Sequence, residues 1–428
     1  MRRILLLGAL SYILILAGLG TMRGEFLLLA LLLLLPVLSA YLTTPVDPAL
    51  SVTRILDVDR VIEGAPVIVQ LTITNHGRKL DQVWVDDQLP QPLIPQDHRH
   101  RALTTLDHGE SQTWSYTLHP PRGAFDLDQV RLMVSDHLGI YHRVIELSSH
   151  QSLLCLPKVT PLRSIPIRPG ATHGYAGPVP ARIGGSGVDF FGIRQYQAGD
   201  PLRWINWRAS ARHAQALFTN EFEQERIADV GVILDARIRT NVQTSSGALF
   251  DHSVRAAASL ADAFLKDGNR VGLLMYGGFL KWVFPGYGKV QQERIMRSLA
   301  EAETGESEVF DHLDYLPTRY FPPHSQIVLV SPLCREDSDV LVRLRARGYQ
   351  VLVITPNPIS FETRDLPNNA QVRLAERIAR MEHAIIFRTL RQVGIQCVDW
   401  HTHQSLSQAM HTSLGRTSAW TNIKRVEP

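Results

Sequence analysis

Two long uncharged segments open the chain. Ile4 to Met22 carries no charged residue, Arg23 to Glu25 interrupts, and Phe26 to Val46 is again uncharged. A helix needs about 20 apolar residues to cross the hydrocarbon core of a bilayer, so the pattern predicts two transmembrane helices in residues 1–46. A signal peptide made from the first segment is the alternative, but it leaves the second segment unexplained.

The basic residues near the amino terminus set the predicted orientation. Arg2 and Arg3 favour the inner side of the membrane, whereas Arg23 is a single arginine beside Glu25. Two spans would return the rest of the chain to the inner side. We therefore expect a plasma (inner) membrane protein with a cytoplasmic soluble part; a single span would place that part outside.

Alternation of apolar and polar residues dominates residues 51–157. It is clearest from Val67 to Ile73, and similar short runs surround Trp84, Tyr116 and Leu132. Turn residues such as Gly and Asn separate these runs. A period of two is typical of half-buried strands, and short strands at this spacing predict an all-β immunoglobulin-like sandwich.

The rhythm changes to alternating strands and helices in residues 230–428. Val230–Leu234 is a short apolar run, typical of a strand buried on both faces, and Ser253–Leu265 has the pattern of an amphipathic helix. Repetition of this unit predicts an α/β domain with a doubly wound, mostly parallel sheet. Ligands of such sheets bind beyond the carboxyl ends of the strands, which here are followed by Asp235–Arg239 and Ser331–Arg335.

Composition narrows the possible functions. The 428 residues include 44 Lys and Arg against 41 Asp and Glu, a net charge of +3, which is too balanced for a dedicated nucleic-acid binder. The chain has no phosphate-binding G-x-x-x-x-G-K-[ST] loop, so we expect no ATP hydrolysis by the chain itself. Its three cysteines, Cys155, Cys334 and Cys397, lie far apart and favour a reducing compartment.

A distinctive motif lies in residues 158–229, which otherwise read as a linker. We predict that Asp200 caps a helix, that Pro201 opens it, and that Trp204 and Trp207 share one of its faces. The segment can dock onto a partner or pin itself to its own core, and both readings stay open. The motif residues are Arg194, Tyr196, Gly199, Asp200, Pro201, Arg203, Trp204 and Trp207.

The order of these parts and the motif R-x-Y-x-x-G-D-P-x-R-x-I-x-W resemble the bacterial family called domain of unknown function 58. The turns Pro121–Gly123 and Asp136–Gly139 also fit, and the similarity extends to at least Val353. The resemblance implies a von Willebrand factor A-like carboxy-terminal domain. It also implies a membrane-anchored, non-enzymatic adaptor that binds a MoxR-type AAA+ ATPase and helps it to assemble or remodel a client complex.

The resemblance raises the question of a metal, because von Willebrand A domains often hold Mg²⁺ through D-x-S-x-S after the first strand. Here Asp235 matches, but Arg237 and Arg239 replace both serines, and Ser331 stands where metal-binding relatives place an aspartate. Arginine offers no acceptor to a cation, so we predict no metal and no cofactor. Instead, these four residues form a predicted partner-binding edge, where an arginine can pair with a partner's carboxylate; pairing with a local acid such as Asp251 is the alternative.

Other candidate functional residues have weaker support in the sequence. Asp399, His401 and His403 have a spacing that can ligate zinc, but no fourth ligand is evident, and we interpret them as an exposed polar tail. Cys334 has no histidine at a motif spacing and is interpreted as an ordinary thiol. A second hypothesis is an envelope-facing module whose sandwich binds surface or cell-wall ligands, and a hydrolase is a third. Neither nucleic acid nor a small-molecule substrate is expected.

Overall fold

A computed structural model gives two compact units, Met1–Leu156 and Pro157–Pro428. The structure describes residues 2–43, 48–95, 99–135, 142–163, 165, 179–212, 216–226, 228–245, 247–307, 309–317, 320–323 and 325–415. The predicted turn at Asp136–Gly139 lies outside these residues.

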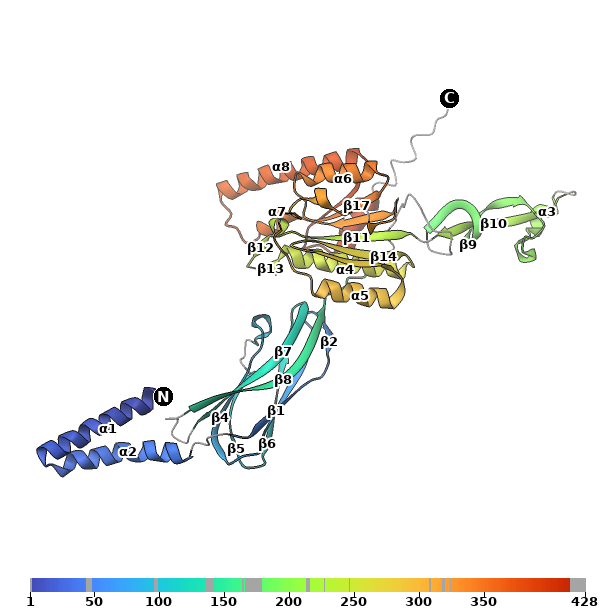
Figure 1. Cartoon of the computed structure of the whole chain (residues 1–428). Coiled ribbons are helices and arrows are strands. Elements are labelled where there is room, and N and C mark those ends of the chain that lie inside the picture. The colour runs from blue at the N-terminus through green and yellow to red at the C-terminus, as the bar shows by residue number, and fades with distance from the viewer. Residues whose placement is uncertain are drawn as a thin grey trace. The chain divides into compact units, whose positions relative to one another are not determined.

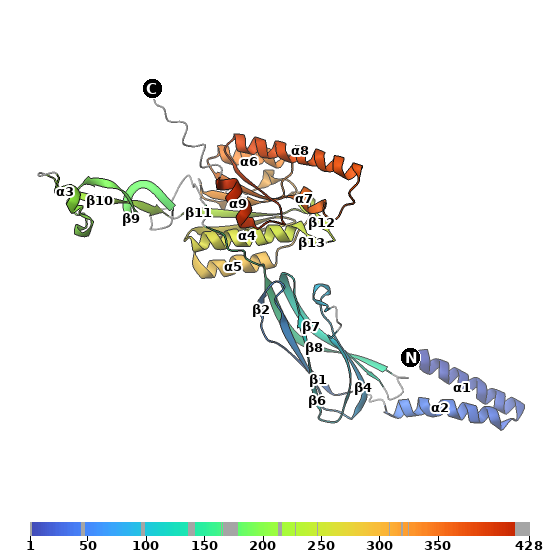
Figure 2. The ribbon, with the colours of Figure 1, turned by 180° about the vertical axis from the view of Figure 1, so that it is seen from behind.

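The first unit begins with two helices, α1 (Arg2–Thr21) and α2 (Gly24–Thr43), which lie side by side (Figures 1 and 2). Met22 makes the turn between them with a φ of 54°. Over the residues that the structure describes, no helix combines the length and the hydropathy needed to cross a membrane. The predicted membrane hairpin, and with it the two-span inner-membrane location, is therefore wrong.

Two facing sheets follow in the first unit. In the first sheet β3 lies between β1 and β6, and in the second the order is β2-β8-β7-β4-β5. Alternate residues of β3 are buried and pack against β4 and β7 of the other sheet, so the period of two in the sequence does mark strands. The elements are β1 (Leu50–Leu56), β2 (Arg60–Ile62), β3 (Val67–Asn75), β4 (Leu80–Asp87), η1 (Gln91–Leu93), β5 (Arg101–Leu106), β6 (Ser111–Leu118), β7 (Gly123–Ser135) and β8 (His142–Leu156).

A fully buried ion pair ties these two sheets together. Arg54 on β1 pairs with Asp87 at the end of β4, and both side chains are 0% exposed. Arg54 also donates to the carbonyl oxygens of Leu127 and Ser149, each at 2.6 Å. Tyr116 donates its hydroxyl to Asp87 at 2.5 Å, and burial, followed by the charge of Asp87, raises the pKa of Tyr116. The network satisfies charges that would otherwise be costly inside an apolar core.

The second unit is built on a six-stranded sheet of order β15-β14-β11-β16-β17-β18. All neighbours are parallel except β15, which runs antiparallel at one edge. Every residue of β11 is buried, as the apolar run at its position predicted. The strands are β11 (Asp229–Ala236), β14 (Arg270–Gly277), β15 (Leu280–Gly286), β16 (Gln326–Val330), β17 (Gln350–Pro356) and β18 (Gln396–Trp400).

Helices cover both faces of this sheet, which is the doubly wound arrangement that the sequence pattern predicted (Figure 1). One face carries α4 (Leu249–Lys266) and α5 (Gly288–Ala300), and the other carries α6 (Asp337–Ala346) and α8 (Ala370–Gln392). Leu341, Phe387 and Leu390 of the second pair pack on the strands. The remaining elements are η3 (Ile238–Thr240), β12 (Gln243–Thr244), β13 (Gly247–Ala248), η4 (Leu313–Tyr315), α7 (Pro358–Glu362) and α9 (Leu406–Gly415).

The motif segment forms a two-stranded antiparallel ribbon that precedes the sheet in sequence. Its strands are β9 (Val179–Gln195) and β10 (Phe218–Arg226), and between them lie η2 (Leu202–Trp204) and α3 (Trp207–Ser210). Residues predicted as a linker thus include regular structure.

We expect Asp87→Ala to destabilise the first unit by about 3–5 kcal/mol, because it leaves the guanidinium of Arg54 buried without a counter-charge. The double variant Arg54→Met/Asp87→Leu should cost much less, since it removes both charges. Urea unfolding of the full chain, followed by hydrogen exchange at β3 and β7, measures the loss where it occurs. Equal losses in the single and double variants would contradict the role assigned to the ion pair.

Candidate functional site

The carboxyl ends of β11 and β16 form the place where a doubly wound sheet can bind a ligand. The chain leaves β11 towards β14 on one side, while β16 pairs on the other side, so the strand order reverses between β11 and β16. Asp235 lies at the end of β11 and Ser331 directly follows β16. The hydroxyl of Ser331 donates to Oδ2 of Asp235 at 2.6 Å, so the structure joins two residues that the sequence placed at this edge.

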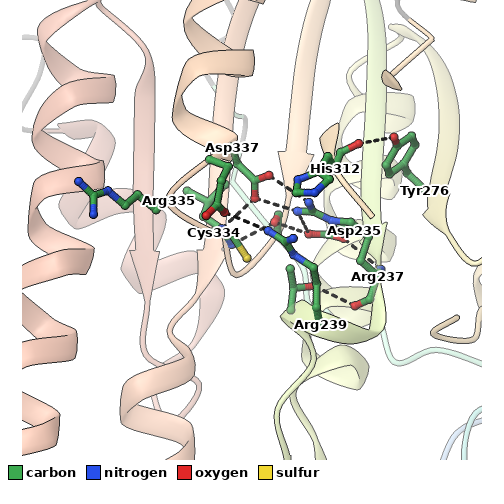
Figure 3. A network of polar contacts seen from close by, with 12 residues as sticks. Asp235, Arg237, Arg239, Tyr276, His312, Cys334, Arg335 and Asp337 are labelled. Carbon is green, nitrogen blue, oxygen red and sulfur yellow. Dashed lines mark hydrogen bonds and ion pairs between the residues drawn. The ribbon is translucent and has the colours of Figure 1, made fainter. Parts of the chain in front are cut away.

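The guanidinium of Arg237 fills this position from within the chain (Figure 3). Its Nε and Nη2 donate to Asp235 at 2.9 and 2.8 Å, and its Nη1 and Nη2 donate to Asp337 at 3.0 and 2.8 Å. Nη1 also donates to the carbonyl oxygen of Asp311 at 3.1 Å. Arginine has five N–H groups, all of which are used here, and the side chain is only 1% exposed.

A tight loop after β16 brings Asp337 to this guanidinium. Ser331 Oγ accepts from the amide of Leu333 at 3.0 Å, and Leu333 has a φ of 60°, a conformation that is uncommon outside glycine. Asp337 is the first residue of α6, and its Oδ2 accepts from the amide of Cys334 at 2.8 Å. The carboxylate of Asp337 therefore fixes the end of this loop and also balances the charge of Arg237.

Glycines allow the backbone to close around the same edge. Arg237 forms a bridge with Gly305, whose amide donates to the carbonyl of Ala236 at 3.0 Å. A Cβ at Gly305 would lie 2.7 Å from the Cα of Gly278, and one at Gly277 would lie 2.4 Å from the carbonyl oxygen of Ala236. Side chains at these positions would push the strands and the loop apart.

The electrostatic environment keeps Arg237 charged and the thiol of Cys334 unreactive. Burial by itself lowers the pKa of Arg237, but Asp235 and Asp337 outweigh it and raise that pKa above its ordinary value. Burial, with the charge of Asp337, raises the pKa of the Cys334 thiol, although Arg239 opposes the rise. The thiolate is the reactive form of cysteine, so at neutral pH Cys334 is a poor nucleophile.

Arg239 is the accessible member of the predicted partner-binding edge. Its side chain is 27% exposed and pairs with Asp311 at 3.1 Å and with Glu336 at 3.0 Å. It lines a groove of about 910 Å³ that continues past Cys334 to α8. Asp235, Arg237 and Ser331 are buried, so of the two arginines that the sequence offered for pairing with a partner's carboxylate, Arg237 or Arg239, the accessible one is Arg239.

The acids that hold these arginines were not among the residues predicted from the sequence. Asp337, Asp311 and Glu336 are the partners, whereas Asp251, the local acid considered above, lies in the first turn of α4. A signal for Asp337 exists in the sequence, because it is an acidic residue that opens α6 a few residues after the strand end that carries Ser331. Its distance of 100 residues from Arg237 hides the pairing itself.

The motif in the ribbon stabilises its own loop. Arg194 makes two hydrogen bonds to Asp200 at 2.8 and 2.6 Å, and Asp200 also accepts from the amide of Gln197 at 2.8 Å. These bonds hold the pKa of Asp200 below its ordinary value. Tyr196 donates its amide to the carbonyl of Leu217 at 2.8 Å, and Gly199 takes a φ of 112° that favours glycine.

Two details of the predicted motif helix are wrong. Pro201, not Asp200, precedes the short helix η2, which has no side-chain cap, and the cap of α3 is Asn206, which accepts from the amide of Ala209 at 2.9 Å. Trp204 and Trp207 lie in different helices. Arg203 lies over the ring of Trp204 at 5.9 Å, whereas Trp207 is 68% exposed and does not pin the segment to a core.

The residues Asp399, His401 and His403 do not form the predicted tail. Asp399 belongs to β18 and accepts from Nδ2 of Asn357 at 2.9 Å, while the rings of His401 and His403 lie 5.7 Å apart. In the part of the chain that the structure describes, no three His, Cys, Asp or Glu side chains gather closely enough to hold a metal ion.

Comparisons with known proteins agree with the resemblance in its coarser form. Residues 192–391 match the model of the family described as Protein of unknown function DUF58. The Uncharacterized protein YeaD of Bacillus subtilis (strain 168) is 30% identical over 194 residues, which cover 45% of this chain and 46% of that protein. The chain thus matches about half the length of this curated relative.

The solved structures that resemble parts of this chain do so only weakly. The CARDB domain of the PF1109 protein from Pyrococcus furiosus is 15% identical, covers 27% of this chain and 100% of that one, and has a TM-score of 0.18. Proximal thread matrix protein 1 from the mussel byssus is 17% identical, covers 30% and 37% of the two chains, and has a TM-score of 0.23. Scores this low carry no argument about function.

We expect Arg237→Met to lower the free energy of unfolding of the second unit by about 3–5 kcal/mol, because two buried carboxylates lose their shared counter-charge. The matched variant Arg239→Met should cost less than about 1 kcal/mol, as partly exposed ion pairs contribute little. Chemical denaturation of the full chain, read at α6 and β11 by hydrogen exchange, compares the two. Similar losses in both would contradict the role assigned to Arg237.

Arg237→Gly should also create a weak cation site, because the carboxylates of Asp235 and Asp337 and the hydroxyl of Ser331 are oxygen ligands of the kind that Mg²⁺ prefers. At a Mg²⁺ concentration ten times its dissociation constant, about 1.4 kcal/mol of the lost stability should return. Thermal unfolding with and without Mg²⁺ measures the recovery, with the unaltered chain as the control. A variant that Mg²⁺ does not stabilise would show that the guanidinium does not stand in a cation's place.

Proposed function

We propose that this chain is a non-enzymatic adaptor that binds a protein partner along α8, beside the carboxyl edge of its six-stranded sheet. The supporting observation is an exposed apolar stripe on this helix. Leu374, Ile378, Met381 and Ile385 are 61%, 52%, 61% and 62% exposed. At 3.6 residues per turn their spacing places them on one face.

The other faces of α8 explain why this stripe cannot be part of the core. Ile386, Phe387 and Leu390 are buried against the sheet, and the helical spacing puts the stripe on the opposite side. Large apolar side chains gathered on a solvent-facing helix face mark an interaction site.

Charge beside the stripe defines the partner's chemistry. The helix carries more arginine than acid, and at 3.6 residues per turn all of its arginines fall on one flank of the stripe. A complementary surface is therefore an apolar ridge with acidic residues along one side. The arginines are Arg373, Arg377, Arg380, Arg388 and Arg391.

The resemblance supplies the identity that we propose for the partner. The sheet order, with an antiparallel edge strand and the first strand in the centre, supports a von Willebrand A-like domain, and such a domain in this family suggests a MoxR-type AAA+ ATPase. Arg239, held by Asp311 and Glu336 at the rim of the adjoining groove, can exchange one of these acids for a carboxylate of the partner. The proposed adaptor would help the ATPase to assemble or remodel a client complex.

We expect Ile378→Ser/Ile385→Ser to abolish recovery of the ATPase with the tagged full chain, because the variant removes the centre of the apolar stripe and leaves the buried face of α8 intact. Purification from cells of the source organism, with and without ATP, followed by mass spectrometry, measures the recovery. Circular dichroism and the melting temperature should stay unchanged.

Leu103→Ser/Val144→Ser is the matched control, since both residues are exposed aliphatic side chains, 62% and 52%, on the strands of the first unit. It should leave recovery of the ATPase unchanged. Failure of the unaltered chain to recover any ATPase, or loss of recovery in the control alone, would overturn the proposal and favour binding through the β-sandwich.

A further inference from the structure

A second cavity lies between α8 and the carboxyl ends of β17 and β18. Its volume is about 820 Å³, a size typical of sites for small molecules. On the helix side it is lined by Arg380, Arg388 and Arg391, and on the strand side by Asp399 and His401. The carboxyl ends of parallel strands are where α/β sheets bind ligands, and this position is separate from the one that Arg237 fills.

The charges in this cavity do not balance. Arg380 pairs with Glu376 at 2.5 Å, but among the described residues neither Arg388 nor Arg391 has a carboxylate partner; Arg391 lies over the ring of Phe387 at 5.5 Å. Asp399 is committed to its own neighbours, as it accepts from Asn357 at 2.9 Å. Two guanidinium groups therefore face the cavity region without a counter-charge, and a doubly charged anion would balance them.

A partly buried histidine adds a polar atom that makes no hydrogen bond within the described part of the chain. His383 borders the cavity, its side chain is 11% exposed, and its Nδ1 lies 3.8 Å from Oδ2 of Asp399. Its Nε2 is buried and makes no hydrogen bond to any described residue. Buried polar atoms nearly always have a partner, so among the residues that the structure describes His383 is an unsatisfied polar group at the edge of the cavity.

We propose that this cavity binds a phosphorylated small molecule through its phosphoryl group. The guanidinium groups of Arg388 and Arg391 match the oxygens of a phosphate in charge and in donor geometry. His383 borders the same cavity and adds positive charge to it when its imidazole is protonated. A phosphate alone is smaller than the cavity, and the remaining space accommodates the rest of the molecule.

Binding should take up a proton at His383. Burial lowers the pKa of His383, Asp399 on β18 raises it, and His401 in the following loop lowers it again; Arg380 and Arg388 of α8 line the same cavity. The imidazole is thus neutral at neutral pH when no anion is bound. A dianion favours the imidazolium, so affinity should rise as the pH falls.

Isothermal titration calorimetry of the full chain tests the site with inorganic phosphate, sulfate and ribose 5-phosphate. We expect Arg388→Gln/Arg391→Gln to weaken binding of ribose 5-phosphate by about tenfold or more, because each lost hydrogen bond involves a charged group. Arg377→Gln, an arginine on the same flank of α8 but outside the cavity lining, should change the affinity by less than about twofold.

Sulfate isolates the histidine, since its charge stays constant across the range where imidazole titrates. Its affinity should increase from pH 8 to pH 6 in the unaltered chain, and the increase should be smaller in His383→Gln. Equal weakening in Arg377→Gln and in the double variant, or no binding of any probe at millimolar concentration, would overturn the proposal. Binding of a phosphoserine peptide without binding of ribose 5-phosphate would do so too, because the anion would then belong to a protein. None of these outcomes depends on recovery of an ATPase.

Discussion

The carboxyl edge of the six-stranded sheet depends on one guanidinium group. Arg237 joins β11, the loop before η4 and the start of α6 through bonds to Asp235, Asp311 and Asp337. A buried charge of this kind is costly unless all of its donors are satisfied, and here all of them are. The position that the sequence marked as a possible place for a metal cation is consequently occupied by the guanidinium of Arg237.

Because Arg237 fills the carboxyl edge of the six-stranded sheet, the accessible surfaces are those around this edge. The residues next to the guanidinium are buried, whereas Arg239 at the rim and the outer face of α8 are accessible. That helix has a buried face, an arginine flank and an exposed apolar stripe. The arginine flank borders the cavity between α8 and the ends of β17 and β18, and Ile385 of the stripe borders the groove that begins at Arg239.

Local patterns predicted local structure well and distant pairings poorly. The apolar run at Val230–Leu234 and the alternation from Val67 to Ile73 lie in β11 and β3, since burial on both faces or on one leaves a direct imprint on the sequence. The pairing of Asp337 with Arg237 was not predicted, because nothing in a sequence indicates which acid an arginine will contact after folding. The role of Asp200 was predicted wrongly for a related reason. Its carboxylate can either cap a helix or bind Arg194, and in the structure it forms the two-bond pair with the guanidinium of Arg194. The opening apolar segments do form helices, but hydropathy alone misjudged what those helices do.

The central place of β11 bears on how the second unit is made during synthesis. Both of its neighbours, β14 and β16, come later in the chain, so a growing polypeptide exposes this apolar strand before anything can pair with it. Asp235 and Arg237 are synthesised almost together and can neutralise one another at once, whereas Asp337 arrives 100 residues later. The ion pairs of Arg237 can therefore be completed only after β16 has been added and α6 begins. A chain interrupted before that point lacks the second carboxylate at this edge of the sheet.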